Sequence, residues 1–271
     1  MKKLVRLTTI LGMLALGFYF YFTNVGQLRP VTNEIFVTAS DLPPTFEGVR
    51  IVQISDVFIR NEASLEMLVH TVEAVNALQP DLVVFTGNLF LPEGLVYQTR
   101  TLEILQQVDA NLSQLAVLGY HDVADADQLT LTVALLEEAG FLVLINDSVE
   151  IFNQAPQGIR IIGAAPTLDA NSTHNLLVTH AQEDRFNVLL ASVPTFSALG
   201  IAQPVHLQLS GHCLGEQNHS DPLHPCAQFY RGVYHFTDAL TLNVSTGTAR
   251  FHTFFGLRHR PSIDSFLLRR E

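Results

Sequence analysis

Four short polar stretches hold the residues of this chain that could carry out chemistry. They span residues 55–58, 86–89, 118–122 and 210–214, and each follows a run of apolar residues. In an α/β sheet, ligands bind beyond the carboxyl ends of the strands, so a carboxylate at such a position points into the functional crevice. Asp56 is therefore the first chemical candidate, and we expect Asn88, His121 and His212 to lie near it.

The apolar runs before the first three stretches have the composition of buried strands. We expect one strand from Ile51 to the Ser55-Asp56 pair and two more at 81–86 and 115–118. Helical spacing of apolar residues predicts helices between and after them, over 64–78 with Ser64 as N-cap, over 96–110 and over 125–139. Strands alternating with helices predict an α/β sheet with helices on its faces.

The chain beyond Phe141 is richer in short strands, which indicates a second sheet in the same domain. Expected strands span 142–145, 149–152, 159–162, 188–191, 205–209, 240–244 and 266–268, and His174 and His180 are placed in loops between them. A short alternating segment, Glu34 to Thr38, predicts an edge strand. The predicted fold is thus a two-sheet α/β sandwich.

Residues 7–25 carry no charge, and three cations precede them: Lys2, Lys3 and Arg6. The run is long enough to cross ~30 Å of hydrocarbon, and the aromatic residues at 18–22 are typical of a membrane interface. We expect a single transmembrane signal anchor there. A cleaved signal peptide is the rival interpretation, although no small-residue cleavage site follows the run, and a buried core helix is the third.

The anchor divides the chain into expected regions. Residues 1–6 lie in the cytoplasm, residues 26–45 form a linker with an edge strand, and residues 46–271 form the globular domain on the exported face of the cytoplasmic membrane. Without the three N-terminal cations, the 12 remaining of 15 Lys and Arg face 26 acids. An acidic body of this kind excludes nucleic acid as a partner, because phosphate neutralisation needs clustered cations.

The two cysteines, Cys213 and Cys226, leave alternatives open. We expect either a disulfide between them, which suits an oxidising compartment, or two unpaired thiols beside solvent-exposed histidines. A zinc site that also uses His212, His219 and His224 is the alternative, although this spacing matches no known zinc module.

The four polar stretches resemble the motifs of the calcineurin-like metallophosphoesterases, and most closely those of their bacterial membrane-anchored phosphohydrolase branch. That family carries Asp-x-His after its first strand, Gly-Asp after the second, Gly-Asn-His-Asp after the third, a lone His in a later loop, and Gly-His-x-His near the end. The order of the motifs and several phrases between them, such as Pro80-Asp81-Leu82 and Arg260-Pro261, extend the resemblance from Leu42 to the C-terminus.

The resemblance implies two-metal hydrolysis of phosphate esters, but most of the implied metal ligands are replaced here. Asp56 and His212 match the family's ligands, and Asn88 stands where the family has its bridging Asp. Four further ligand positions are occupied by other residue types: Phe58, Tyr120, Ser192 and Leu214. The two retained ligands serve different metals in the family, so neither metal keeps three protein ligands.

Two functional hypotheses follow. The leading one is a membrane-anchored pseudoenzyme that keeps the fold, holds no metal, and binds a lipid or protein ligand at the former active-site cleft, with His121 as a vestigial general acid. The alternative is an active hydrolase with an altered site, which would use two divalent ions (Mn, Fe or Zn) on a lipid-linked phosphate or pyrophosphate near the membrane. In that case Asn88 would coordinate through its carbonyl oxygen.

Overall fold

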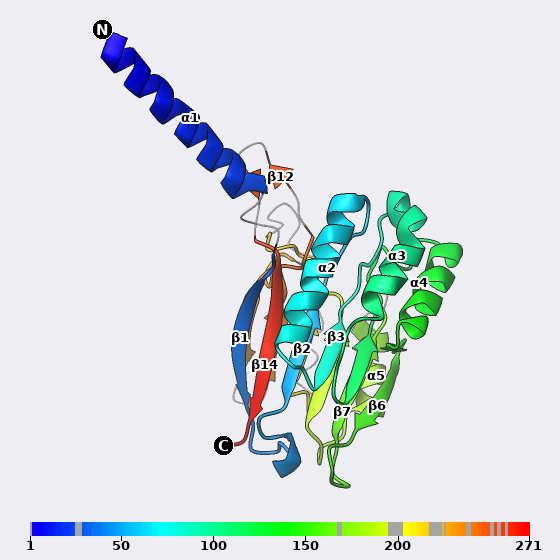
Figure 1. Ribbon diagram of the computed structural model, residues 1–271. Helices are drawn as coiled ribbons and strands as arrows, with labels where there is room; N and C mark the ends of the chain where they lie inside the picture. The colour runs from blue at the N-terminus through cyan, green and yellow to red at the C-terminus, as the bar shows by residue number, and fades with distance from the viewer. Residues whose placement is uncertain are drawn as a thin grey trace.

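Two six-stranded sheets pack face to face, and helices cover their outer faces (Figure 1). The computed structural model of the chain describes residues 2–24, 29–166, 170–194, 203–216, 224, 226–236, 240–249, 252–253, 256–257 and 260–271. The two-sheet sandwich expected from the sequence is confirmed.

The first sheet has the strand order β1-β14-β2-β3-β4-β5. Its strands are β1 (Val31–Thr38), β14 (Ser262–Arg269), β2 (Arg50–Ile54), β3 (Leu82–Phe85), β4 (Ser113–Ala116) and β5 (Leu142–Val143). The strands from β2 to β5 run parallel, β14 runs antiparallel to β2, and β1 runs parallel to β14. As a result, the starts of β1 and β14 lie at the same edge as the carboxyl ends of β2, β3 and β4.

The second sheet has the strand order β10-β11-β9-β8-β7-β6. Its strands are β10 (Gly232–Phe236), β11 (Leu240–Val244), β9 (Leu207–Ser210), β8 (Asn187–Ala191), β7 (Ile159–Ala164) and β6 (Asp147–Ile151). The four central strands are parallel, and β10 and β6 are antiparallel edges. A separate two-stranded sheet pairs β12 (His252–Thr253) with β13 (Gly256–Leu257).

Apolar side chains fill three layers between these elements. The helices α2 (Glu62–Ala77), α3 (Gln98–Leu105) and α4 (Ala126–Glu138) pack on the first sheet, and α5 (Ala170–His180) packs on the second. Between the two sheets lies a cluster whose fully buried members include Ile51, Val84, Ile161, Leu190 and Phe266. The short helices η1 (Pro44–Phe46) and η2 (Pro92–Tyr97) precede β2 and α3.

The N-terminal helix α1 (Lys2–Asn24) projects from the end of the molecule opposite the C-terminus (Figure 1). Its exposed apolar side chains include Leu11, Leu14 and Phe18. No helix in the described part of the chain meets the length and hydropathy required to span a bilayer. The transmembrane assignment of residues 7–25 therefore stays a prediction.

Local sequence signals located some elements better than others. Asp125 caps α4 by accepting the Gln128 N–H, and Gly140 follows that helix with φ +96°, as expected. In α2 the N-cap is Asn61 and not Ser64, because Ser64 is the third helical residue of a reciprocal capping box with Asn61.

Several elements escaped the sequence prediction, among them α5, β10 and the strand pair β12 and β13. Residues 170–180 form α5 instead of loops, so the placement of His174 and His180 was wrong. The segment 232–236 forms the unexpected strand β10. The edge strand expected at 34–38 is real, but it begins earlier, at Val31.

The close approach of the two sheets yields a stability prediction at Gly163 in β7. A Cβ at this position would overlap the Leu144 Cβ and lie 2.9 Å from Val117 Cγ1, both in the packed interior. We expect Gly163→Ala to lower the free energy of unfolding by about 1–3 kcal/mol through overpacking. Denaturant unfolding measures the change, and Gly12→Ala, where nothing lies within 4 Å, is the control. Equal stability of the two variants would contradict the packing described.

Candidate functional site

The polar stretches predicted to form a site meet at one edge of the sandwich. Asp56 follows β2, Asn88 follows β3 and His121 follows β4 in the first sheet, while His212 follows β9 in the second. Main-chain hydrogen bonds join the first two loops, from Asp56 N to Gly87 O and from Phe58 N to Asn88 O. The order of parallel strands thus brings these residues together.

The centre of the site is a hydrogen bond between the side chains of Asp56 and Asn88, both fully buried. Asn88 Nδ2 donates to Asp56 Oδ1 at 2.7 Å, and the main-chain N–H of His121 donates to Asn88 Oδ1 at 3.1 Å. A carboxylate only accepts and a main-chain N–H only donates, so these two partners fix the orientation of the amide. The other carboxylate oxygen, Asp56 Oδ2, accepts from Ser55 Oγ and His212 N, each at 2.8 Å.

Asp122 is a second buried carboxylate, to which the sequence analysis assigned no role. Its oxygens accept the main-chain N–H groups of Asn88, Leu89 and Gly119 at 2.6–2.8 Å. These bonds hold the loop after β3 against the loop after β4. The position of Asp122 directly after His121, at a strand end, could have indicated from the sequence that it belongs to the site.

Backbone strain concentrates at this edge. Asp56, Phe58, Asn88, His212 and Leu214 all have φ between +49° and +71°. Asp and Asn tolerate this left-handed conformation, whereas Phe and Leu rarely adopt it. Such residues cost about 1–3 kcal/mol each, persist only where the surroundings over-determine them, and are typical of functional sites.

Two aromatic residues at implied ligand positions pack against the retained histidines. Phe58 is buried and meets the His121 ring edge to face at 5.1 Å between centroids. Tyr120 is 41% exposed, and its ring centroid lies 5.2 Å from that of His212. His224 stacks on the same His212 ring, with 6.4 Å between the centroids. Each of the two imidazoles therefore contacts an aromatic side chain at an implied ligand position.

The remaining implied ligand positions contribute no metal ligand set. Ser192 is fully buried, and its hydroxyl has no hydrogen-bond partner among the described residues. Leu214 is half-buried and carries only carbon. Cys213 and Cys226 form a disulfide, so neither sulfur is a thiolate and the alternative zinc site was wrong. His219, which that alternative also used, lies outside the described residues.

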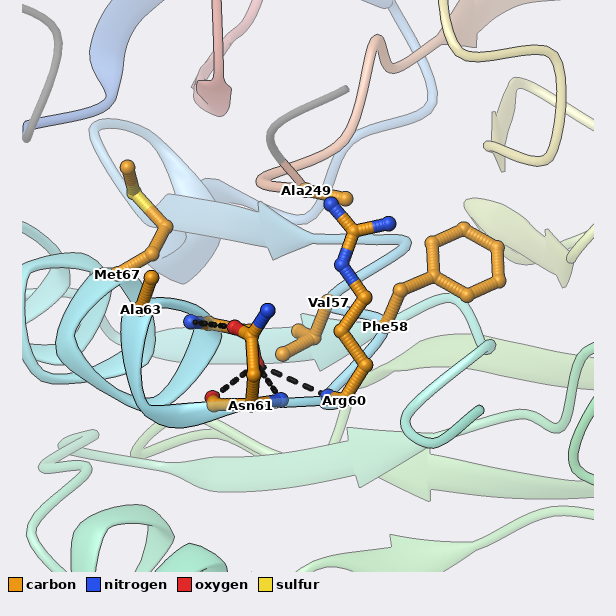
Figure 2. A pocket seen from close by; sticks show the side chains of 8 residues that line it. Val57, Phe58, Arg60, Asn61, Ala63, Met67 and Ala249 are labelled. Atoms are coloured by element: carbon orange, nitrogen blue, oxygen red, sulfur yellow. Dashed lines mark hydrogen bonds between the residues drawn. The ribbon is translucent and has the colours of Figure 1, made fainter. Parts of the chain in front are cut away.

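A cavity of about 150 Å³ lies beside Phe58 (Figure 2). Val57, Phe58 and Met67 supply apolar lining, and Arg60 extends along the cavity toward Ala249 (Figure 2). A space of this size holds a group as large as a benzene ring. The substitution that removes an implied metal ligand at position 58 also forms an apolar wall.

Burial shifts the pKa values of the two retained ligand types toward their neutral forms. The pKa of Asp56 is raised to about 6, chiefly because burial desolvates the carboxylate, with repulsion from Asp122 adding to the effect and the hydrogen bonds from Asn88, Ser55 and His212 opposing it. The pKa of His212 is lowered to about 4 by burial first, and then by the nearby His224 and His121. His212 is therefore a neutral imidazole at pH 7.

The residues at this edge do not fit a pair of dications. Such a centre needs oxygen lone pairs from positions 56 and 88 directed at the ions. Here Asp56 accepts three protein hydrogen bonds, and the Asn88 side chain presents a donor to it. Within the part of the chain that the structure describes, no three His, Cys, Asp or Glu side chains gather as a metal-binding group.

Comparison with known proteins gives a consistent set of relatives, although no family model matches the chain. An uncharacterized metallophosphoesterase of Bacillus subtilis, YkuE, is 27% identical over 227 residues, which cover 80% of this chain and 79% of the relative. A bovine transmembrane protein with metallophosphoesterase domain is 27% identical over an alignment that covers 97% of this chain and 61% of the relative. The chain thus spans about three fifths of that relative's length.

A third relative is similar over a shorter stretch. The UDP-2,3-diacylglucosamine pyrophosphatase LpxG of Chlamydia trachomatis is 31% identical over 121 residues, 44% of this chain and 36% of that protein. Among solved structures, the NAD nucleotidase of Haemophilus influenzae superposes with a TM-score of 0.51 at 14% identity, covering 77% of this chain and 48% of that one. This structural likeness supports the fold alone.

The buried carboxylate predicts a pH-dependent stability. Unfolded Asp titrates near 3.9, so the stability that protonated Asp56 contributes is present below pH 4 and is lost as the pH rises through about 6. His212 acts oppositely, since its depressed pKa makes stability fall as the pH drops from about 6.5 toward 4. We therefore compare His212→Ala with the double variant His212→Ala and Asp56→Ala.

In that comparison the difference in unfolding free energy should change by about 2 kcal/mol between pH 4 and pH 7, because each pKa unit corresponds to ~1.4 kcal/mol and Asp in the unfolded chain is already half ionised near pH 4. Denaturant unfolding of the full chain in detergent at both pH values measures it. The loss of packing and hydrogen bonds caused by Asp56→Ala is the same at both pH values, so it cancels when the two differences in unfolding free energy are subtracted. A difference that is independent of pH would contradict the burial of Asp56 as a strained, desolvated acid.

Proposed function

Because the chain belongs to the calcineurin-like metallophosphoesterases, we propose that it is a membrane-associated member that acts by binding and not by hydrolysis. The observation that carries the proposal is the hydrogen bond from Asn88 to Asp56. It ties together the two side chains that the metal ions would need as ligands. Phe58 and Leu214 add apolar bulk at two further ligand positions. His121 alone, without an activated nucleophile, provides little catalysis.

Membrane association in this proposal rests on the relatives and on the N-terminal sequence. The bovine and zebrafish relatives are named as transmembrane proteins, and the described side chains of α1 include exposed large apolar residues between Ile10 and Tyr19. We assign residues 7–25 to a single membrane span with the globular domain on the exported face, following the positive-inside rule. A lipid or a protein then binds at the remodelled edge of the domain.

A second candidate function is supported by one comparison. The chlamydial relatives LpxG are named as pyrophosphatases of a diacylated sugar nucleotide, which favours an active hydrolase of a lipid-linked phosphate or pyrophosphate. Asp56, His121 and His212 are retained for such a role. This candidate requires the Asn88 amide to rotate and present its oxygen to a metal, which would break its bonds to Asp56 and to the His121 N–H.

Metal content separates the two candidates. We expect the full chain, purified in detergent and dialysed against Mn²⁺ or Zn²⁺, to retain well below one equivalent by mass spectrometry of the elements and to leave bis(p-nitrophenyl) phosphate intact. Phe58→His combined with Leu214→His restores two nitrogen ligands, so metal retention should rise.

The matched control is Phe36→His combined with Leu142→His, which makes the same changes at two exposed positions. Its metal content should equal that of the parent. If the parent itself retains two equivalents and cleaves the phosphodiester, the hydrolase candidate is correct and the binding proposal fails.

A further inference from the structure

A second cavity lies between the edges of the two sheets that are formed by β1 and β10. It has a volume of about 400 Å³, and its walls come from β1 and β14 of the first sheet and from β10 and β11 of the second. Small-molecule sites have volumes of about 300–1,000 Å³. Ile35 and Val233 supply apolar walls, so the cavity has the size and the mixed lining of a ligand site.

The floor of this cavity is a buried carboxylate held by two amides. Asp264 is 3% exposed, and it accepts hydrogen bonds from Asn33 Nδ2 at 2.7 Å and from Asn243 Nδ2 at 3.2 Å. No described arginine or histidine forms an ion pair with it. A carboxylate has about four lone-pair positions, so Asp264 can accept further donors from a ligand, and an ammonium group offers three donors together with the opposite charge.

The rim carries the opposite charge. Arg231 lines the cavity and is exposed, and its guanidinium lies 5.6 Å from the centre of the Tyr230 ring, a contact that limits its motion. A guanidinium binds phosphate in a planar, bidentate way. Rim and floor together therefore suit a ligand that carries a phosphate at one end and an ammonium group at the other.

The cavity also lies on the side of the domain that the N-terminal helix can reach. Helix α1 ends at Asn24 and β1 begins at Val31, so the connection is at most about 25 Å long. Asn33 lies two residues into β1, about 7 Å further along the strand. Figure 1 shows α1 at the end where β1 and β14 begin, and Arg29 and Arg260 are exposed there.

From these contacts we propose that the cavity binds the phosphoethanolamine headgroup of a membrane lipid. The phosphate contacts Arg231, the ammonium group donates to Asp264, and the glycerol carbons pack on Ile35 and Val233. The lipid source rests on the membrane association proposed above, whereas the headgroup chemistry does not depend on the fate of the metal site. The site thus gives the domain a second, headgroup-specific attachment to the bilayer surface.

Native mass spectrometry of the full chain in uncharged detergent tests the proposal. The probe is an equimolar mixture of phosphatidylethanolamine, phosphatidylglycerol and phosphatidylcholine with identical acyl chains. We expect phosphatidylethanolamine to occupy the protein at least fivefold more than either competitor. Arg231→Ala and Asp264→Asn should each remove most of this preference, and Val233→Trp, which adds bulk to the cavity wall and keeps the Asp264 carboxylate, should remove it even if Asp264→Asn fails to fold.

The control is Arg270→Ala, an exposed arginine beyond the far end of β14, which should retain the preference. Equal occupancy by the three lipids, a preference for phosphatidylglycerol, or equal behaviour of Arg231→Ala and Arg270→Ala would overturn the proposal. If free phosphoethanolamine displaces the lipid at equal concentration, the ligand is the soluble headgroup compound and the lipid assignment is wrong. None of these results depends on metal content, so failure here is distinct from failure of the binding function proposed for the chain.

Discussion

The hydrogen bond between Asn88 and Asp56 determines what this site can do. Two cations bridged by a carboxylate repel each other and need anionic oxygen ligands at short distance. An amide nitrogen that donates to the neighbouring carboxylate replaces that electrostatic arrangement with a self-contained pair, in which protein donors occupy both carboxylate oxygens. The surrounding groups satisfy the remaining oxygens of the pair. Ser55 Oγ and the His212 N–H donate to the Asp56 carboxylate, and the His121 N–H donates to the Asn88 amide oxygen.

The scaffold around that pair is kept although its ligands are changed. Asp122 still holds two loops together through three main-chain N–H groups, and bulky residues at positions 58 and 214 still adopt the left-handed conformation. Gly211 shows how tightly the loops approach, because a Cβ there would overlap the side chains of Ser55 and Asp56. The physical reason is that the strand ends fix the loops independently of the residue types at the implied ligand positions.

Sequence alone predicted the parts of this molecule that depend on local or alternating patterns. The capped helix α4, the buried strands β2 to β4 and the two-sheet architecture follow from spacing and from cap residues. Helix α5 was missed because its sequence is largely Asn, Ser, Thr and His, and the packing of Leu176 and Leu177 on the second sheet stabilises it. The strand β10 was missed because it is an exposed edge whose partner, β11, defines it.

The candidate site divides in the same way. The order of the strands explains the proximity of four residues: Asp56, Asn88, His121 and His212. The sequence showed directly that their side chains are polar. Which atom of the Asn88 amide faces Asp56 depends on donors and acceptors that only the folded chain brings within 3 Å. The cavity floored by Asp264 joins residues 231 positions apart in the sequence, so no local pattern could have indicated it.

The most direct test of the account is a crystal structure of the full chain grown in millimolar Mn²⁺, with anomalous diffraction data recorded at the manganese absorption edge. The account predicts no anomalous peak within coordination distance of Asp56, with Asn88 Nδ2 still donating to its carboxylate. Two manganese peaks about 3.5–4 Å apart at this edge, with the amide oxygen turned toward them, would contradict it.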